Sequence, residues 1–266
     1  MSKPLTNEYW RSLGQGYQNV ADKRRITLVY QAAANEGDQL GQLSMAEDLI
    51  NQGFATLLLS PQTAANLIPA VEAAKAKGIP VLNVNDAVIP SAEHFVGNVQ
   101  KGNGVNVAKW FIANRPDGGK VAVIEGQPGV YAAGQRTAGF TETINAAGKF
   151  TVVASVPANW SREEAFNAAA TILQQYPDLI GFYANNDGMA LGVVVAVKAA
   201  GKQSQVAVFG TDGISDADAA IKAGDLAGTV DSFPVLTGEI AMEVSLRLLA
   251  GQALPRVVAT PQALIT

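Results

Sequence analysis

The chain has 266 residues, of which 48% are hydrophobic and 16% charged, and this composition excludes an intrinsically disordered protein. The formal net charge of −4 gives no basic footprint for nucleic acid, and the absence of cysteine excludes a disulfide framework and thiolate chemistry. The length is sufficient for a large core and makes two domains plausible.

Strands and helices are expected to alternate along the chain, because apolar runs bounded by turn residues are followed by helical periodicity. The expected strands are 26–30, 54–59, 80–84, 120–125, 150–156, 180–184, 206–209, 226–230 and the tail 259–265. The expected helices are 7–21, 38–51, 63–78, 102–114, 130–147, 162–176, 189–200, a short helix ending at 224, and 235–250. This alternation predicts an α/β fold with doubly wound parallel sheets. Since there are too many units for one open sheet, we expect two similar domains that join near Asn98.

Residues 1–5 lack the basic region and apolar run of a signal peptide. No segment approaches the roughly 20 apolar residues of a membrane span. We therefore expect a soluble chain, either cytoplasmic or exported with its signal removed.

The strand 180–184 is followed abruptly by Asn185, Asn186 and Asp187, and then by a helical pattern from Met189. Asn186 or Asp187 is a suitable helix N-cap. Two amides and a carboxylate are more than one cap needs, and ligands of open α/β sheets lie beyond the carboxyl ends of the strands. We therefore expect Asn186 or Asp187 to face a ligand, with capping alone as the alternative.

Other polar residues also follow expected strands. They are Ser60, Asn85, Asp86, Gly126, Gln127, Trp160, Thr211, Asp212, Asp231 and Ser232. Each alone is explained by a turn or a cap, but together they predict one polar edge for each sheet. With the aromatic residues Tyr9, Trp10 and Trp160, such an edge suits a neutral polyhydroxylated ligand. The alternative for Trp10 is a place in the core.

Signatures of enzymes are weak. His94 is the only histidine and falls in an expected loop without a triad or a metal cluster. Neither the phosphate-loop nor the dinucleotide-binding glycine motif occurs. Asp86, Asp187, Asp212 and Asp231 are carboxylates from which a glycosidase pair could be drawn, but nothing positions two of them around a bond. We expect no catalytic residue, no metal and no cofactor.

Four segments carry a resemblance to a known family: 6–10 (TNEYW), 136–140 (RTAGF), 185–192 (NNDGMALG) and 210–213 (GTDG). In order and spacing they resemble the periplasmic sugar-binding proteins of the ribose-binding type, which feed ABC transporters. That family shares its fold with the effector domains of LacI-type repressors. The resemblance covers nearly the whole chain.

The resemblance implies two lobes joined by a hinge of three crossings, with a sugar in the cleft between them. Residues 1–98 with 233–258 would form the N-terminal lobe, and 99–232 with 259–266 the C-terminal lobe. The residues implied to bind the sugar are Asn7, Tyr9, Trp10, Asn85, Asp86, Arg136, Trp160, Asn186, Asp212 and Ser232. The aromatic residues would sandwich the sugar ring, and Arg136 would donate to its oxygens.

The chain departs from the family pattern at two points of the expected site. Ribose binders carry an Asp-Arg pair where this chain has Asn85 and Asp86, and a longer amide where it has Ser232. Acids therefore outnumber Arg136, which disfavours an anionic ligand. A neutral monosaccharide or polyol is expected, with an amino-bearing ligand as the alternative.

The resemblance further implies a monomer that works with an ABC permease and binds no nucleic acid. It would lie in the periplasm or be lipid-anchored outside the cell membrane. One alternative is the ligand-sensing domain of a LacI-type regulator, which should carry an N-terminal helix-turn-helix headpiece. Another is an enzyme acting on sugars.

Overall fold

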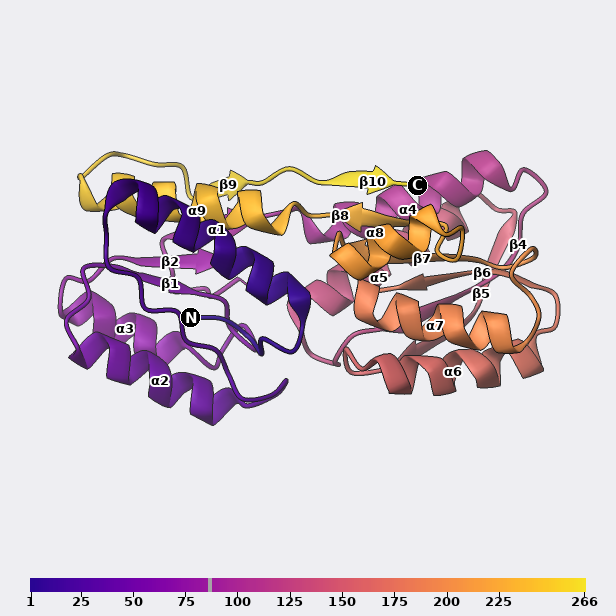
Figure 1. Cartoon of the computed structure of the whole chain (residues 1–266), viewed down its shortest axis with the longest axis horizontal. Helices are drawn as coiled ribbons and strands as arrows, with labels where there is room; N and C mark the ends of the chain where they lie inside the picture. The colour runs from indigo at the N-terminus through magenta and orange to yellow at the C-terminus, as the bar shows by residue number, and fades with distance from the viewer. Residues whose placement is uncertain (86–87) are drawn as a thin grey trace. The chain divides into compact units, whose positions relative to one another are not determined.

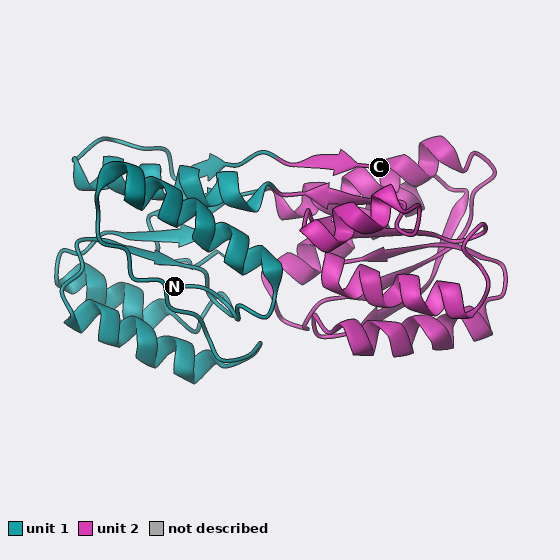
Figure 2. Cartoon of the chain, in the orientation of Figure 1, with its two compact units in different colours: residues 1–98, 233–261 teal, residues 99–232, 262–266 magenta. Residues whose placement is uncertain are grey.

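The computed structural model describes residues 1–85 and 88–266, so Asp86 lies outside the described residues. The chain divides into two compact units (Figure 2), residues 1–98 with 233–261 and residues 99–232 with 262–266. The expected division assigned 259–261 to the C-terminal lobe. Those residues belong to the first unit, because the strand Val257–Ala259 pairs with the strand His94–Gly97.

The first unit holds a four-stranded parallel sheet in the order β1-β2-β3-β9. Its strands are β1 (Leu57–Leu59), β2 (Val81–Val84), β3 (His94–Gly97) and β9 (Val257–Ala259). Helices cover both faces (Figure 1): α2 (Gln39–Asn51) and α3 (Ile68–Ala76) on one, α1 (Glu8–Arg24) and α9 (Pro234–Leu249) on the other. Burial on both faces explains the continuous apolar run of β1 and the full burial of β2, in which Asn83 is the one polar residue.

The second unit holds a six-stranded sheet in the order β10-β8-β7-β6-β4-β5, in which only β10 is antiparallel. Its strands are β4 (Gly119–Glu125), β5 (Phe150–Pro157), β6 (Leu179–Ala184), β7 (Ala207–Asp212), β8 (Gly228–Asp231) and β10 (Ala263–Ile265). Its helices are α4 (Gln100–Asn114), α5 (Tyr131–Ala146), α6 (Arg162–Gln175), α7 (Asp187–Ala199) and α8 (Ser215–Lys222). The pair α4 and α5 covers one face and the pair α6 and α7 the other.

Two glycines allow α4 and α5 to touch at the level of the backbone. A side chain at Gly104 would clash with the carbonyl oxygen of Arg136, and one at Gly139 with the carbonyl oxygen of Lys101. Only glycine permits this approach. The contact fixes the backbone of Arg136 against α4.

The expected strand at Ile26–Tyr30 is wrong. The segment has no strand assignment, and none of the backbone groups of Thr27–Tyr30 bonds to the backbone of another described residue. A strand needs a neighbour, and only Met1 and Ser2 lie between this segment and β1. Met1 bonds to Leu58 and Ser60, and Ser2 bonds to Gln31 and Ala33.

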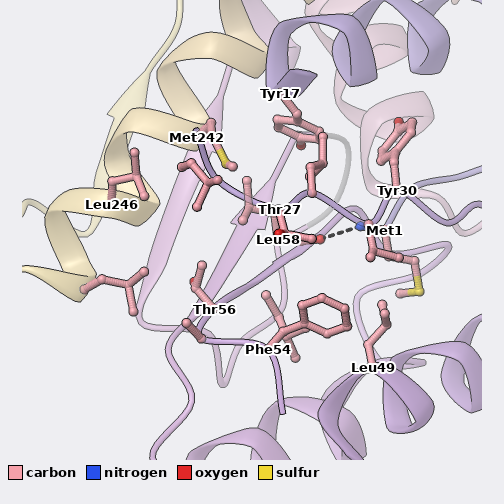
Figure 3. Close-up of a pocket in the computed structure, with 16 residues that line it drawn as sticks. Met1, Tyr17, Thr27, Tyr30, Leu49, Phe54, Thr56, Leu58, Met242 and Leu246 are labelled. Carbon is pink, nitrogen blue, oxygen red and sulfur yellow. Dashed lines mark hydrogen bonds between the residues drawn. The ribbon is translucent and has the colours of Figure 1, made fainter. Parts of the chain in front are cut away.

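A mostly apolar cavity of about 120 Å³ lies beside Met1, and we call it the N-terminal trough (Figure 3). Its lining residues are Met1, Tyr17, 26–30, Leu49, 54–58, Met242, Leu246 and Leu249. The Met1 amino group points into the trough and donates to the carbonyl oxygen of Leu58 at 2.8 Å. The trough thus occupies the place where a strand between 26–30 and β1 would lie.

Other elements differ in their bounds. Strand 54–59 and helix 63–78 are shorter than expected, as β1 and α3 show. The tail 259–265 is split into β9 and β10, because residues 260–262 carry the chain from one unit to the other. His94, expected in a loop, begins β3, and its Nδ1 lies 3.0 Å from the carbonyl oxygen of Pro255.

None of the helices in the described part of the chain has the length and apolar character of a membrane span.

Candidate functional site

Polar side chains of the second unit gather where its parallel strands end. Because β4, β6, β7 and β8 run in the same direction, the residues that follow them share one edge of the sheet. The expected site residues at this edge are nearly excluded from solvent, namely Arg136 (3% exposed), Asn186 (3%), Asp212 (4%) and Ser232 (0%). Buried polar groups need partners, and these partners define the arrangement.

Arg136 is the central cation of this edge. Its Nη1 lies 3.2 Å from Oδ1 of Asp212 and donates to the carbonyl oxygen of Asn185 at 2.6 Å. Its Nε donates to Oε1 of Gln100 at 2.8 Å. A guanidinium held on three sides is fixed in orientation, and charge-assisted hydrogen bonds are stronger than neutral ones. The structure therefore presents Arg136 and Asp212 as one rigid, charge-compensated group.

Asp212 ends β7 in an unusual backbone conformation. Its φ is +133°, a region that residues with a side chain seldom adopt, and Gly213 follows with φ +78°. The carbonyl oxygen of Asp212 accepts from the N–H of Ser232 at 3.2 Å, which connects the ends of β7 and β8. The turn after β7 thus brings Asp212 to Arg136.

Asn185 and Asn186 have different tasks. Oδ1 of Asn186 accepts from the N–H of Met189 at 2.9 Å and caps α7, so the capping interpretation is correct for this oxygen. Its Nδ2 has no hydrogen-bond partner among residues 1–85 and 88–266. Oδ1 of Asn185 accepts from the N–H of Gly126 at 3.0 Å and from Oγ1 of Thr137 at 3.1 Å. Asn185 therefore fastens the loop after β4, and Asn186 keeps an amide donor.

Trp160 lies in the loop after β5, half-buried and with φ +64°. Its ring lies so close to Gly126 that any side chain at that position would clash with it. The ring also packs on Val130, Ala132 and Ala133. Because Gly126 bonds to Asn185, the aromatic face and the polar edge are linked through one loop.

In the first unit, Asn7 caps α1 through its Oδ1, which accepts from the N–H of Tyr9 at 3.0 Å. Tyr9 and Trp10 are 2% and 4% exposed, with their ring centroids 4.9 Å apart in an edge-on contact. Both belong to the core formed with α9, as the alternative for Trp10 anticipated. Nζ of Lys3, a buried residue, lies 6.0 Å from the Trp10 ring centroid.

Asn85 follows β2 and is 1% exposed, with φ +51° and its N–H bonded to the carbonyl oxygen of Val96 at 2.7 Å. The structure therefore brings Arg136, Asp212, Asn186, Ser232 and Trp160 to one edge of the second unit. It groups the other described members of the expected set, Asn7, Tyr9, Trp10 and Asn85, in the first unit. Whether these residues bind a ligand stays a prediction.

Sequence reasoning missed Gln100 and the role of Asp187. Gln100 begins α4 without a motif that would mark it, and its contact with Arg136 depends on how α4 packs on α5. Asp187 is fully buried and bonds within its own unit, and this burial raises its pKa to about 6. No cluster of three or more potential metal ligands occurs in the described ranges.

Comparison with known proteins identifies the family of this chain. The periplasmic binding protein domain matches residues 1–253 of this chain. The chain belongs to the periplasmic binding protein domain family. The resemblance drawn from the four sequence motifs is therefore confirmed, together with the α/β fold.

Two relatives show where the chain lies in this family. It is 33% identical to the D-allose-binding periplasmic protein of Escherichia coli (strain K12), over 91% of this chain and 81% of that protein. It is 34% identical to the ribose import binding protein of Bacillus subtilis (strain 168), over 98% of this chain and 84% of that protein.

Among solved structures, a periplasmic solute-binding protein of an ABC transporter from Actinobacillus succinogenes 130z, with bound D-allose, matches with a TM-score of 0.92. The identity is 31%, and the match covers 99% of this chain and 94% of that one. These periplasmic binding proteins favour the solute-binding interpretation over the effector domain of a LacI-type regulator.

Proposed function

We propose that this periplasmic binding protein is the solute-binding component of an ABC importer and binds a neutral monosaccharide or polyol. The buried pair of Arg136 and Asp212 carries this proposal. A sugar hydroxyl can accept from a guanidinium and donate to a carboxylate at the same time, so the pair satisfies both halves of a hydroxyl group. The two relatives and the solved structure support the proposal through their named ligands, D-allose and ribose.

The local charge supports a neutral ligand. Arg136 is already compensated by Asp212, and Asp187 adds a second carboxylate nearby, with Arg136 within electrostatic range. A phosphate or carboxylate at this edge would lose its hydration beside the carboxylates of Asp212 and Asp187. Among the expected site residues of the second unit, Arg136 is the one cation, and Asp212 already compensates its charge. Hydroxyl groups carry no such penalty.

The remaining members of the expected set have complementary roles in this proposal. The amide of Asn186 donates a hydrogen bond, Ser232 adds a hydroxyl, and the Trp160 face packs on sugar C–H groups. Asn7, Tyr9, Trp10, Asn85 and Asp86 would contribute from the first unit, as the family resemblance implies. We propose that sugar binding draws the two units together, which would lower the radius of gyration in small-angle scattering.

We propose that the protein catalyses no reaction. Of the three candidate acids in the second unit, Asp212 is paired with Arg136, and Asp187 accepts from Thr229 and two backbone N–H groups, which leaves no two of them held around a bond for catalysis. We further propose a monomer that lies in the periplasm or is lipid-anchored outside the cell membrane, delivers its sugar to an ABC permease and binds no nucleic acid.

A thermal-shift screen tests the ligand class. The probes are D-ribose, D-allose and xylitol, with D-ribose 5-phosphate as the matched anionic control. A ligand present at about 100 times its dissociation constant stabilises by about 2.7 kcal/mol, which raises the Tm by roughly 5–10 °C for a chain of this size. A shift with a neutral probe and none with the phosphate is expected. No shift with any neutral sugar or polyol, or a larger shift with the phosphate, would overturn the proposal.

A further inference from the structure

Asp187 joins three segments that are distant in sequence. Its Oδ2 accepts from the N–H of Gly213 at 2.8 Å and from the N–H of Ile214 at 3.1 Å. Its Oδ1 accepts from the hydroxyl of Thr229 at 2.6 Å. One carboxylate at the start of α7 thus holds the turn after β7 and the strand β8.

Helix α7 does not need this carboxylate as its cap. Asn186 already supplies the capping oxygen, through Met189. A fully buried carboxylate is costly, and the burial of Asp187 raises its pKa to about 6 in spite of three hydrogen bonds. Such a group is explained by what it holds in place.

The turn that Asp187 holds is the one that carries Asp212. Gly213 and Ile214 directly follow Asp212, whose φ of +133° is unfavourable for a residue with a side chain. Strained conformations persist only where surrounding contacts fix them. The two hydrogen bonds to Asp187 fix the peptide groups immediately after the strained residue, and Gly213 itself has no room for a side chain because of Asp231.

We propose that Asp187 is a positioning residue. Its hydrogen bonds with the N–H groups of Gly213 and Ile214 direct the carboxylate of Asp212 toward Arg136. The consequence for ligand affinity rests on the proposed function, because it requires that this pair contacts the sugar. The geometric part does not require it, since it concerns only the separation of 3.2 Å between Nη1 of Arg136 and Oδ1 of Asp212.

The competing explanation is that Asp187 only stabilises the second unit and does not affect the geometry of the Arg136–Asp212 pair. The two explanations predict different effects for the loss of Asp187. If Asp187 is only a stabilising residue, its variants lose stability and keep their sugar affinity. If it is a positioning residue, its variants bind sugar more weakly than a control variant of the same stability. Val193 provides the matched control, because it is fully buried in the same helix α7 and packs in the core beneath the sheet.

The test compares Asp187→Ala and Asp187→Ser with Val193→Ala by calorimetric titration of D-allose and of D-ribose. Loss of the Asp187 carboxylate is expected to raise the Kd for the sugar by about tenfold or more. Val193→Ala should stay within about twofold, because it is independent of the pair. Wild-type affinity in both Asp187 variants would overturn the proposal.

A measurement without ligand separates this inference from the proposed function. The Nε–H of Arg136, which bonds to Gln100, should exchange with solvent about tenfold faster in the Asp187 variants and unchanged in Val193→Ala. If neither sugar binds wild type, the proposed function fails while this readout still decides the geometry. If the Asp187 variants do not fold, amide exchange in wild type decides. Protected N–H groups at Gly213 and Ile214 support their hydrogen bonds to Asp187, and exchange as fast as in exposed loops overturns the proposal.

Discussion

Arg136 and Asp212 form an ion pair with an Nη1–Oδ1 distance of 3.2 Å, and their side chains are only 4% and 6% exposed. The removal of one partner leaves the other as a desolvated charge, which is more costly than the loss of the interaction itself. The pair is therefore sensitive to mutation in both stability and binding.

Asp212→Ala is expected to lower the free energy of unfolding by about 3 kcal/mol, because Arg136 stays buried without its counter-ion. Urea unfolding measures this loss, and calorimetry should show weakened sugar binding in the same variant. The matched control is Asp216→Ala, which breaks the exposed pair with Arg162 at 3.4 Å. Its effect should stay below about 1 kcal/mol. Equal losses in the two variants would contradict the prediction.

The titration of Asp187 should be visible in the pH dependence of stability. Its pKa is raised from 3.8 to about 6 by burial, so the folded state binds the proton more tightly than the unfolded state. The stability that this proton contributes is fully present below pH 3.8 and is lost as the pH rises to about 6.

Asp187→Asn abolishes this titration. The difference in unfolding free energy between wild type and the variant should fall by on the order of 3 kcal/mol at most between pH 4 and 7. Nearby Tyr183 stays neutral over this range, because burial raises its pKa to about 12. A difference that stays constant with pH would mean that Asp187 does not titrate there.

Gly126 is expected to control the position of Trp160. In Gly126→Ala the added methyl group would clash with the indole, so the ring must move, at a cost of about 1–3 kcal/mol in stability. Sugar affinity should fall with it, as measured by calorimetry and tryptophan fluorescence. Gly134→Ala is the control, because nothing lies near the new methyl group on the exposed side of α5. That variant should be stabilised by about 0.5–1 kcal/mol.

The N-terminal trough predicts a stabilising extension. A segment Val-Thr-Ile-Val-Val placed before Met1 can pair with the unbonded backbone of Thr27–Tyr30 and bury apolar side chains, which should add roughly 2 kcal/mol or more. A Gly-Ser segment of the same length is the control. Calorimetric scanning compares the two, and equal Tm values would show that the trough does not accept a strand.

The same extension should alter the pH dependence of stability. Burial lowers the pKa of the Met1 amino group from 8.0 to about 5, so the folded state binds this proton less tightly. Stability should therefore rise between pH 5 and 8 in the unextended chain. A peptide N–H in place of the ammonium removes this rise.

Much of the fold could be predicted because most strands carry their own signal. Strand β6 and positions 121–124 of β4 are apolar runs that are almost entirely buried. The segment Ile26–Tyr30 has the same composition, yet it forms no strand, because pairing depends on a neighbour that composition does not report. The tail was predicted as one strand because no local signal marks the passage between units at residues 260–262.

In the second unit, the residues of the candidate site could be predicted where they follow a strand or sit in a motif, as Arg136 and Asp212 do. The role of Asp187 could not, because its partners lie 26 to 42 positions away. Gln100 was missed for a similar reason, since its partner Arg136 is 36 positions away on another helix. Such contacts are set by packing and not by local pattern.

The two sheets differ in how their edges are protected. In the second unit the antiparallel strand β10 pairs with β8 and forms the edge of the sheet. In the first unit the edge of β1 faces the N-terminal trough, with the unbonded backbone of Thr27–Tyr30 opposite. Exposed strand edges are templates for pairing with other molecules. A segment that fills the trough and pairs with Thr27–Tyr30 should therefore delay aggregation on heating.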